Sequence, residues 1–72
     1  MPDADLVSEV IEVATRLISE SRTGEIQGEE VSREIGRADA DLYWAFQEVK
    51  RRRVLDMYFP GGMALPSIVR LP

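Results

Sequence analysis

The sequence contains no cysteine and no histidine, and these two absences exclude much of the chemistry that enzymes use. Without these residues there is no thiolate nucleophile, no imidazole base and no ordinary zinc site, and the serines have no base to activate them. The pair Gly61-Gly62 lacks the Lys-Ser/Thr sequence of a phosphate-binding loop. We therefore expect a protein that is not an enzyme, with no catalytic residue, no metal site and no cofactor.

Long apolar runs are also missing from the sequence. No stretch approaches the roughly 20 apolar residues that span a bilayer, and the acidic start at Met1–Asp5 is unlike a secretory signal or a transit peptide. Because a chain without cysteine forms no disulfide, a reducing compartment is the simplest setting. The sequence therefore predicts a cytoplasmic protein with no membrane partner. Its 72 residues suffice for a single domain over residues 1–72.

Positive charge is scarce except near the C-terminus. Residues 1–49 hold four basic and twelve acidic residues, a net charge of −8, whereas residues 50–72 hold five basic residues and one acidic residue, a net charge of +4. A helix C-terminus attracts cations, but this explains one or two of the consecutive basic residues 50–53 more readily than all four. The total charge of −4 argues weakly against a nucleic-acid partner, and the basic end argues for one.

A first helix is predicted over residues 4–20, with an apolar stripe wider than one contact with a small core requires. In one explanation the helix lies centrally and touches both other helices and the hairpin. In the other, an edge of the stripe packs against a second copy in a homodimer. The residues proposed for that edge are Leu6, Val13 and Leu17.

Two further helices are predicted over residues 28–35 and 39–52. Before them, Glu25-Ile26-Gln27 is expected to form a short link with one β-bridge, in which Ile26 turns inward. Gly36 is expected to end the second helix, and Asp39 is a good N-cap for the third. The turn between these helices has the length and the leading glycine of a helix-turn-helix.

A β-hairpin is predicted over residues 54–71. Residues 54–59 are mostly β-branched, aromatic or aliphatic, and residues 67–71 form the returning strand. Phe59-Pro60-Gly61-Gly62 has the residues of a type II turn, with Pro at the second position and Gly at the third. Pro66 cannot donate to a ladder, so we expect it at a bulge or an edge. The core is expected to contain Val10, Ala14, Leu17, Val31, Ile35, Leu42, Phe46, Val49 and Val54.

The order helix, short strand, helix, glycine turn, helix, hairpin resembles a winged helix-turn-helix domain of the bacterial transcription-regulator type. The resemblance covers roughly residues 26–71. Residues 26–36, IQGEEVSREIG, look like the support helix of such regulators. The inward positions of their recognition helix and following strand are matched by Leu42, Ala45, Phe46, Val49 and Val54. The resemblance implies a mainly helical α+β fold with three helices and a small hairpin wing; it does not fix function, because winged helices also bind proteins.

Two features depart from the family pattern. Arg53 stands where many members place a glycine after the recognition helix, so we expect the turn there to be strained or differently shaped. Asp39 and Asp41 put negative charge at the helix end that the family directs into the major groove. These carboxylates suit a helix N-terminus but repel phosphates.

The resemblance implies a small transcription regulator that reads double-stranded DNA with its third helix. Gln47 and Arg51 are the best candidates for base edges, because Gln suits adenine and Arg suits guanine. Tyr43 and Trp44 are expected to contact thymine methyls or the backbone. The full set of candidate DNA-binding residues is Ala40, Tyr43, Trp44, Gln47, Lys50, Arg51, Arg52 and Arg53, with the wing around Tyr58 to Met63 as a further phosphate contact.

The alternative is a winged helix that binds a protein through the same helix. At about 100° per residue, Trp44 lies opposite the apolar face, and an outward Trp marks a contact surface. In this interpretation Tyr43 and Trp44 are buried anchors and Arg51 is a charged hot spot, residue types that are enriched at such sites. The acidic total charge and Asp39 and Asp41 favour the protein partner; Gln47 and the basic run favour DNA.

Overall fold

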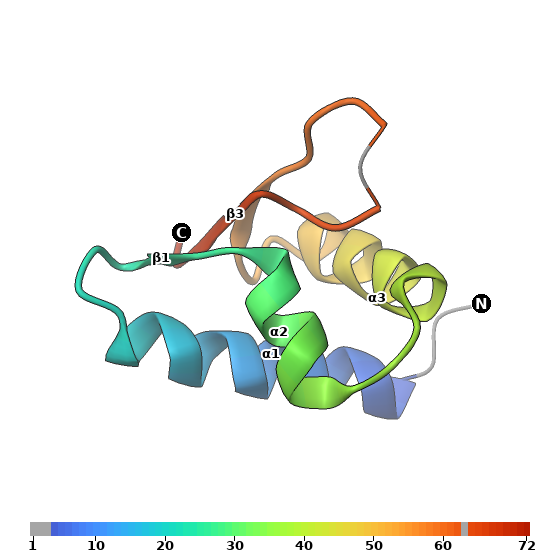
Figure 1. Ribbon diagram of the computed structural model, residues 1–72, viewed down its shortest axis with the longest axis horizontal. Coiled ribbons are helices and arrows are strands. Elements are labelled where there is room, and N and C mark those ends of the chain that lie inside the picture. The colour runs from blue at the N-terminus through green and yellow to red at the C-terminus, as the bar shows by residue number, and fades with distance from the viewer. Residues whose placement is uncertain (1–3, 63) are drawn as a thin grey trace.

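The computed structural model describes residues 4–62 and 64–72. Over these residues three helices lie on one side and a three-stranded antiparallel sheet lies on the other, in the strand order β1-β3-β2 (Figure 1). This is an α+β winged-helix-like fold, as the sequence predicts. The elements are α1 (Ala4–Glu20), β1 (Glu25–Ile26), α2 (Gly28–Ile35), α3 (Asp39–Arg51), β2 (Asp56–Tyr58) and β3 (Ile68–Arg70).

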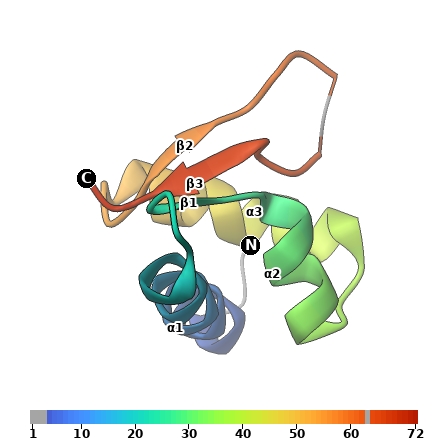
Figure 2. The ribbon, with the colours of Figure 1, turned by 60° about the vertical axis from the view of Figure 1, so that its left-hand side comes forward.

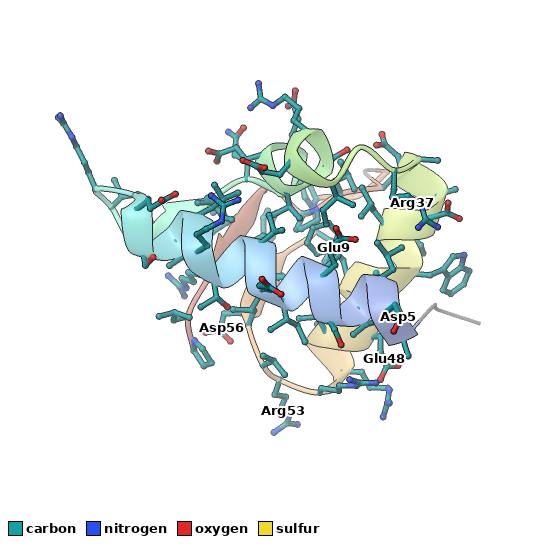
Figure 3. All side chains as sticks on the ribbon, turned by 90° about the horizontal axis from the view of Figure 1, so that it is seen from below. Asp5, Glu9, Arg37, Glu48, Arg53 and Asp56 are labelled. Carbon is teal, nitrogen blue, oxygen red and sulfur yellow. The ribbon has the colours of Figure 1, made fainter. Side chains whose placement is uncertain are left out.

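Helix α1 is the central element of the core. It crosses α3 (Figure 3) and also packs against α2 and the sheet, which explains its wide apolar stripe. Leu6 is buried within the chain, so its predicted place in a dimer seam is wrong. Val13 and Leu17 are partly buried against the same core. A homodimer through α1 would therefore rest on these two residues without Leu6.

Most of the predicted core is confirmed, with one error next to α3. Val54 is 37% exposed, whereas the following residue, Leu55, is 2% exposed and takes its place in the core. Leu17 and Ile35 lie at the margin of the core and are only partly buried. The fully formed core consists of Leu6, Val7, Val10, Ala14, Ile18, Ile26, Val31, Leu42, Ala45, Phe46, Val49, Leu55 and Val69.

The helix-turn-helix forms as predicted, except at its second cap. Gly36 ends α2 with φ 73°, and its N–H donates to the carbonyl oxygen of Ser32 at 2.8 Å. Ala38, not Asp39, is the N-cap of α3, because its extended backbone and its carbonyl start the helix. Asp39 is the first helical residue, and its carboxylate accepts a hydrogen bond from the Ser32 hydroxyl at 3.4 Å. A carboxylate there still stabilises the positive end of α3.

Helix α3 ends one residue earlier than predicted, at Arg51, in a Schellman-type turn. The N–H of Arg53 donates to Lys50 O at 3.1 Å, and the N–H of Val54 donates to Val49 O at 3.4 Å. Arg53 has φ 57°, the left-handed conformation that glycine usually supplies at this position. The turn confirms the expectation of an unusual backbone at Arg53 and directs Leu55, instead of Val54, toward the core.

The wing is a short hairpin with a long loop. Strand β2 spans only Asp56–Tyr58, and residues 59–67 separate it from β3 (Figure 2). The predicted type II turn is wrong, because it needs a positive φ at Gly61 and the structure has one at Gly62 (81°). The contribution expected from Met63 lies outside the described residues.

The sheet presents one face to the helices. Met57 of β2 pairs with Val69 of β3, and Val69 also pairs with Ile26 of β1. Ile26 and Val69 are buried and Met57 packs against the core, whereas Tyr58 and Ile68 face outward and are exposed. Ile26 is therefore turned inward, as predicted.

The return arm of the wing is fastened to the start of α2. The N–H of Gly28 donates to the carbonyl oxygen of Pro66 at 2.8 Å. A Cβ atom at position 28 would lie 2.6 Å from Pro66 Cδ, so only glycine permits this approach. Pro66 is buried and lies two residues before β3 begins, outside the ladder to which it cannot donate, and not at the predicted bulge or edge. Within residues 4–62 and 64–72, no helix is long and apolar enough to cross a membrane.

Candidate nucleic-acid interface

Helix α3 has one face in the core and the other in solvent. Leu42, Ala45, Phe46 and Val49 are completely buried in the hydrophobic core, where α3 packs mainly on α1. On the opposite side Trp44 is 60% exposed, which is unusual for the largest apolar side chain of the protein. The rings of Tyr43 and Trp44 form an edge-to-face contact, with their centres 5.2 Å apart and their planes at 79°.

The structure brings five of the eight predicted site residues together. They line a shallow, open depression on the outer side of α3, and among the described residues Glu48 completes its lining. Of the other three, Ala40 is exposed at the start of α3, Tyr43 borders Trp44, and Arg52 turns toward Glu48. The predicted residues in the depression are Trp44, Gln47, Lys50, Arg51 and Arg53.

Glu48 is the site residue that the sequence interpretation missed. Its carboxylate accepts hydrogen bonds from Nε of Arg51 at 3.1 Å, from Nη2 of Arg51, and from Nε of Arg52 at 2.7 Å. These hydrogen bonds, to Arg51 first and then to Arg52, lower the pKa of the Glu48 carboxyl below its ordinary value. The signal was present in the sequence, because residues three and four apart are neighbours on a helix.

Lys50 connects the interface to the wing. Its ammonium nitrogen lies 5.2 Å from the centre of the Phe59 ring, close enough for a cation–π contact. Phe59 is the first residue of the wing loop, directly after β2. The basic end of α3 and the base of the wing therefore form one continuous surface.

The two acidic residues at the start of α3 have partners. Asp41 forms an ion pair with Arg37 at 3.5 Å, and Asp39 accepts from the Ser32 hydroxyl. Figure 3 shows Arg37 at the start of α3 and Arg53 projecting beyond its far end. The helix thus has a partly neutralised first turn and a basic last turn.

A second depression lies between α2 and the loop of the wing. It contains one basic and two acidic side chains, and its remaining lining is small, apolar or uncharged. In the part of the chain that the structure describes, no group of three or more His, Cys, Asp or Glu side chains is placed to hold a metal ion. The residues that line this depression are Gln27, Glu29, Ser32, Arg33, Asp39, Gly62, Ala64, Leu65, Pro66 and Ser67.

In comparisons with known proteins, no family model, no curated protein and no solved structure matches this chain. The assignment to a winged-helix-like fold therefore rests on the element order and the packing described above. Membership of the winged helix-turn-helix regulators remains a proposal.

Proposed function

We propose that the protein is a small winged-helix transcription regulator that binds double-stranded DNA with the outer face of α3. One observation carries the proposal: Gln47, Lys50, Arg51 and Arg53 line a single open depression next to the wing. Amide and guanidinium groups on an exposed helix face suit the base edges and phosphates of a major groove. A cytoplasmic location is part of this proposal, supported by a chain without cysteine.

Some side chains of α3 would contact the DNA bases and others the sugar-phosphate backbone. Gln47 and Arg51 would meet base edges, and Tyr43 and Trp44 would contact thymine methyls or sugars. The basic side chains at the end of α3 would hold phosphates together with the wing. Those phosphate contacts are assigned to Lys50, Arg52 and Arg53.

Local charge supports this arrangement despite the acidic total. Glu48 offsets only one of the four positive charges at the end of α3, so the end of the helix stays basic. At the start of α3, Asp41 forms an ion pair with Arg37, which reduces the repulsion between Asp41 and DNA phosphates. Electrostatic attraction of DNA depends on this local field more than on the net charge.

A fluorescence-anisotropy titration tests the proposal. The wild-type protein should bind a random duplex at low salt and bind a duplex selected from a random pool more tightly. Arg51→Ala should weaken the selected complex by about 1–3 kcal/mol. Arg22→Ala is the matched control, because it removes the same charge from the exposed loop after α1. Absence of binding to any duplex at low salt would refute the proposal.

The exposed pair of aromatic rings supports a second candidate, a protein-binding winged helix. Trp44 and Tyr43 would be buried at the centre of that interface. Trp44→Ala should then abolish capture of the partner with little dependence on salt, because buried aromatic area would supply the affinity. Duplex binding that survives Trp44→Ala and is lost in Arg51→Ala would exclude this candidate.

A further inference from the structure

Glu48 holds Arg51 by one side of the guanidinium group. Nε and Nη2 of Arg51 donate to the two carboxylate oxygens, so both hydrogens of Nη1 and the second hydrogen of Nη2 point away from Glu48. The side chain of Arg51 is 72% exposed. Among the described residues, only Glu48 accepts a hydrogen bond from it. The two terminal nitrogens, Nη1 and Nη2, form the fork of the guanidinium group. The end of this fork, with two parallel N–H donors, therefore faces solvent.

We propose that Arg51 reads a guanine in duplex DNA through this open end, and that Glu48 is the positioning residue that sets the preference. The inference rests on the proposed function. Guanine presents O6 and N7 side by side in the major groove, which matches two parallel donors. Adenine presents N7 beside an amino group, so one donor of Arg51 would face another donor. The site would therefore select guanine and reject adenine.

The second role of Glu48 is to limit attraction to phosphates. A carboxylate beside Arg51 and Arg52 offsets part of their charge and keeps the Arg51 fork from turning to the backbone. Holding the side chain in advance also reduces the rotamer entropy lost on binding. Glu48→Gln should consequently change two quantities in opposite directions: affinity for a random duplex rises, and discrimination for guanine falls. If Glu48 only stabilised the fold, its replacement would not change affinity and discrimination in opposite directions.

The test compares guanine with 7-deazaguanine, which lacks the N7 acceptor. A duplex is first selected from a random pool with the wild-type protein, and each selected guanine is then replaced in turn. At one position the replacement should weaken wild-type binding about 5-fold or more. For the Glu48→Gln variant, the loss of affinity caused by 7-deazaguanine at that position should be clearly smaller than for the wild type. The affinity of this variant for a random duplex should be higher. Glu12→Gln removes the same charge from the exposed face of α1 and should behave as the wild type.

Arg51→Lys provides a second variant should Glu48→Gln fail to fold. It keeps the positive charge and loses the fork, so it should retain affinity for a random duplex and lose the preference for guanine. The inference would be overturned if either variant kept the full preference for guanine. It would also be overturned if no 7-deazaguanine replacement weakened wild-type binding to the selected duplex. Both outcomes would leave DNA binding intact. Failure of the wild type to bind any duplex at low salt would overturn the proposed function and the inference together.

Discussion

Arg53 carries the least favourable backbone conformation outside glycine in the described part of the chain. Its φ of 57° lies in the left-handed region, where the Cβ of an L-residue crowds the backbone. The hydrogen bonds from Arg53 and Val54 back to α3 hold the residue there. Its exposed side chain lines the outer depression of the candidate interface, so the strained backbone lies within the site itself.

Replacing Arg53 by glycine should stabilise the protein. Arg53→Gly removes the crowding at a positive φ, a gain that exceeds the extra chain entropy of glycine and amounts to about 1 kcal/mol. The midpoint of urea unfolding should rise with an unchanged slope. Arg53→Ala is the matched control, because it also removes the charged side chain but keeps a Cβ atom at the positive φ. Equal stability changes in the two variants would show that Arg53 is not strained.

Glu48 gives the stability of the protein an acid-dependent component. Because hydrogen bonds from Arg51 and Arg52 lower the pKa of its carboxyl in the folded chain, Glu48 stabilises the fold most when ionised. This contribution is complete above the pKa of the unfolded chain and disappears as the pH falls through the lower pKa of the folded chain. The urea midpoint of Glu48→Gln should therefore lie below that of the wild type at neutral pH and approach it in acid.

A matched variant separates this effect from the loss of one acidic residue. Glu12→Gln changes the same functional group on α1, at a position that forms no ion pair among the described residues. Its midpoint should follow that of the wild type as the pH is lowered. A constant difference between Glu48→Gln and the wild type at every pH would contradict the role assigned to the ion pairs.

At the scale of elements, the contact between α2 and the wing fixes where the wing lies. Gly28→Ala would place a Cβ atom 2.6 Å from Pro66 Cδ and 2.7 Å from the Pro66 carbonyl oxygen. The overlap should displace the return arm and cost about 1–3 kcal/mol of stability. Hydrogen exchange should also accelerate at the amides of β3. Gly61→Ala is the control, since a Cβ there meets no atom of the described residues within 4 Å, apart from its chain neighbours. An equal loss in both variants would contradict this account.

Local patterns predict the helices well and the wing less well, for a physical reason. The spacing of Leu42, Ala45 and Phe46 fixes the buried face of α3 and thereby places Trp44 outside. The pairing of Glu48 with the arginines was also readable from spacing. The approach of Gly28 to Pro66 joins segments far apart in the sequence, so no local pattern reveals it. The inward turn of Leu55 depends on the backbone of Arg53, which sequence spacing does not specify.

At the scale of the whole molecule, charge is divided between the ends of the sequence, and the fold keeps the basic part on the surface. Residues 50–53 are all exposed where α3 ends, whereas the acidic residues of the described chain are spread over all three helices and two strands. Asp5 and Glu9, for example, lie along α1 (Figure 3). Attraction of DNA to one end and repulsion from the rest would orient the protein as it approaches the duplex.

The salt dependence of binding measures how many phosphates the basic end engages. Contacts from Lys50, Arg52 and Arg53 would release three counterions, giving a slope of about −2.7 for log Kobs against log salt concentration on B-DNA. Arg52→Ala should weaken binding to all duplexes alike and make the slope shallower by about 0.9. Arg22→Ala should leave the slope unchanged. A wild-type slope near zero, or equal slopes for Arg52→Ala and the wild type, would mean that the basic end does not hold the DNA backbone.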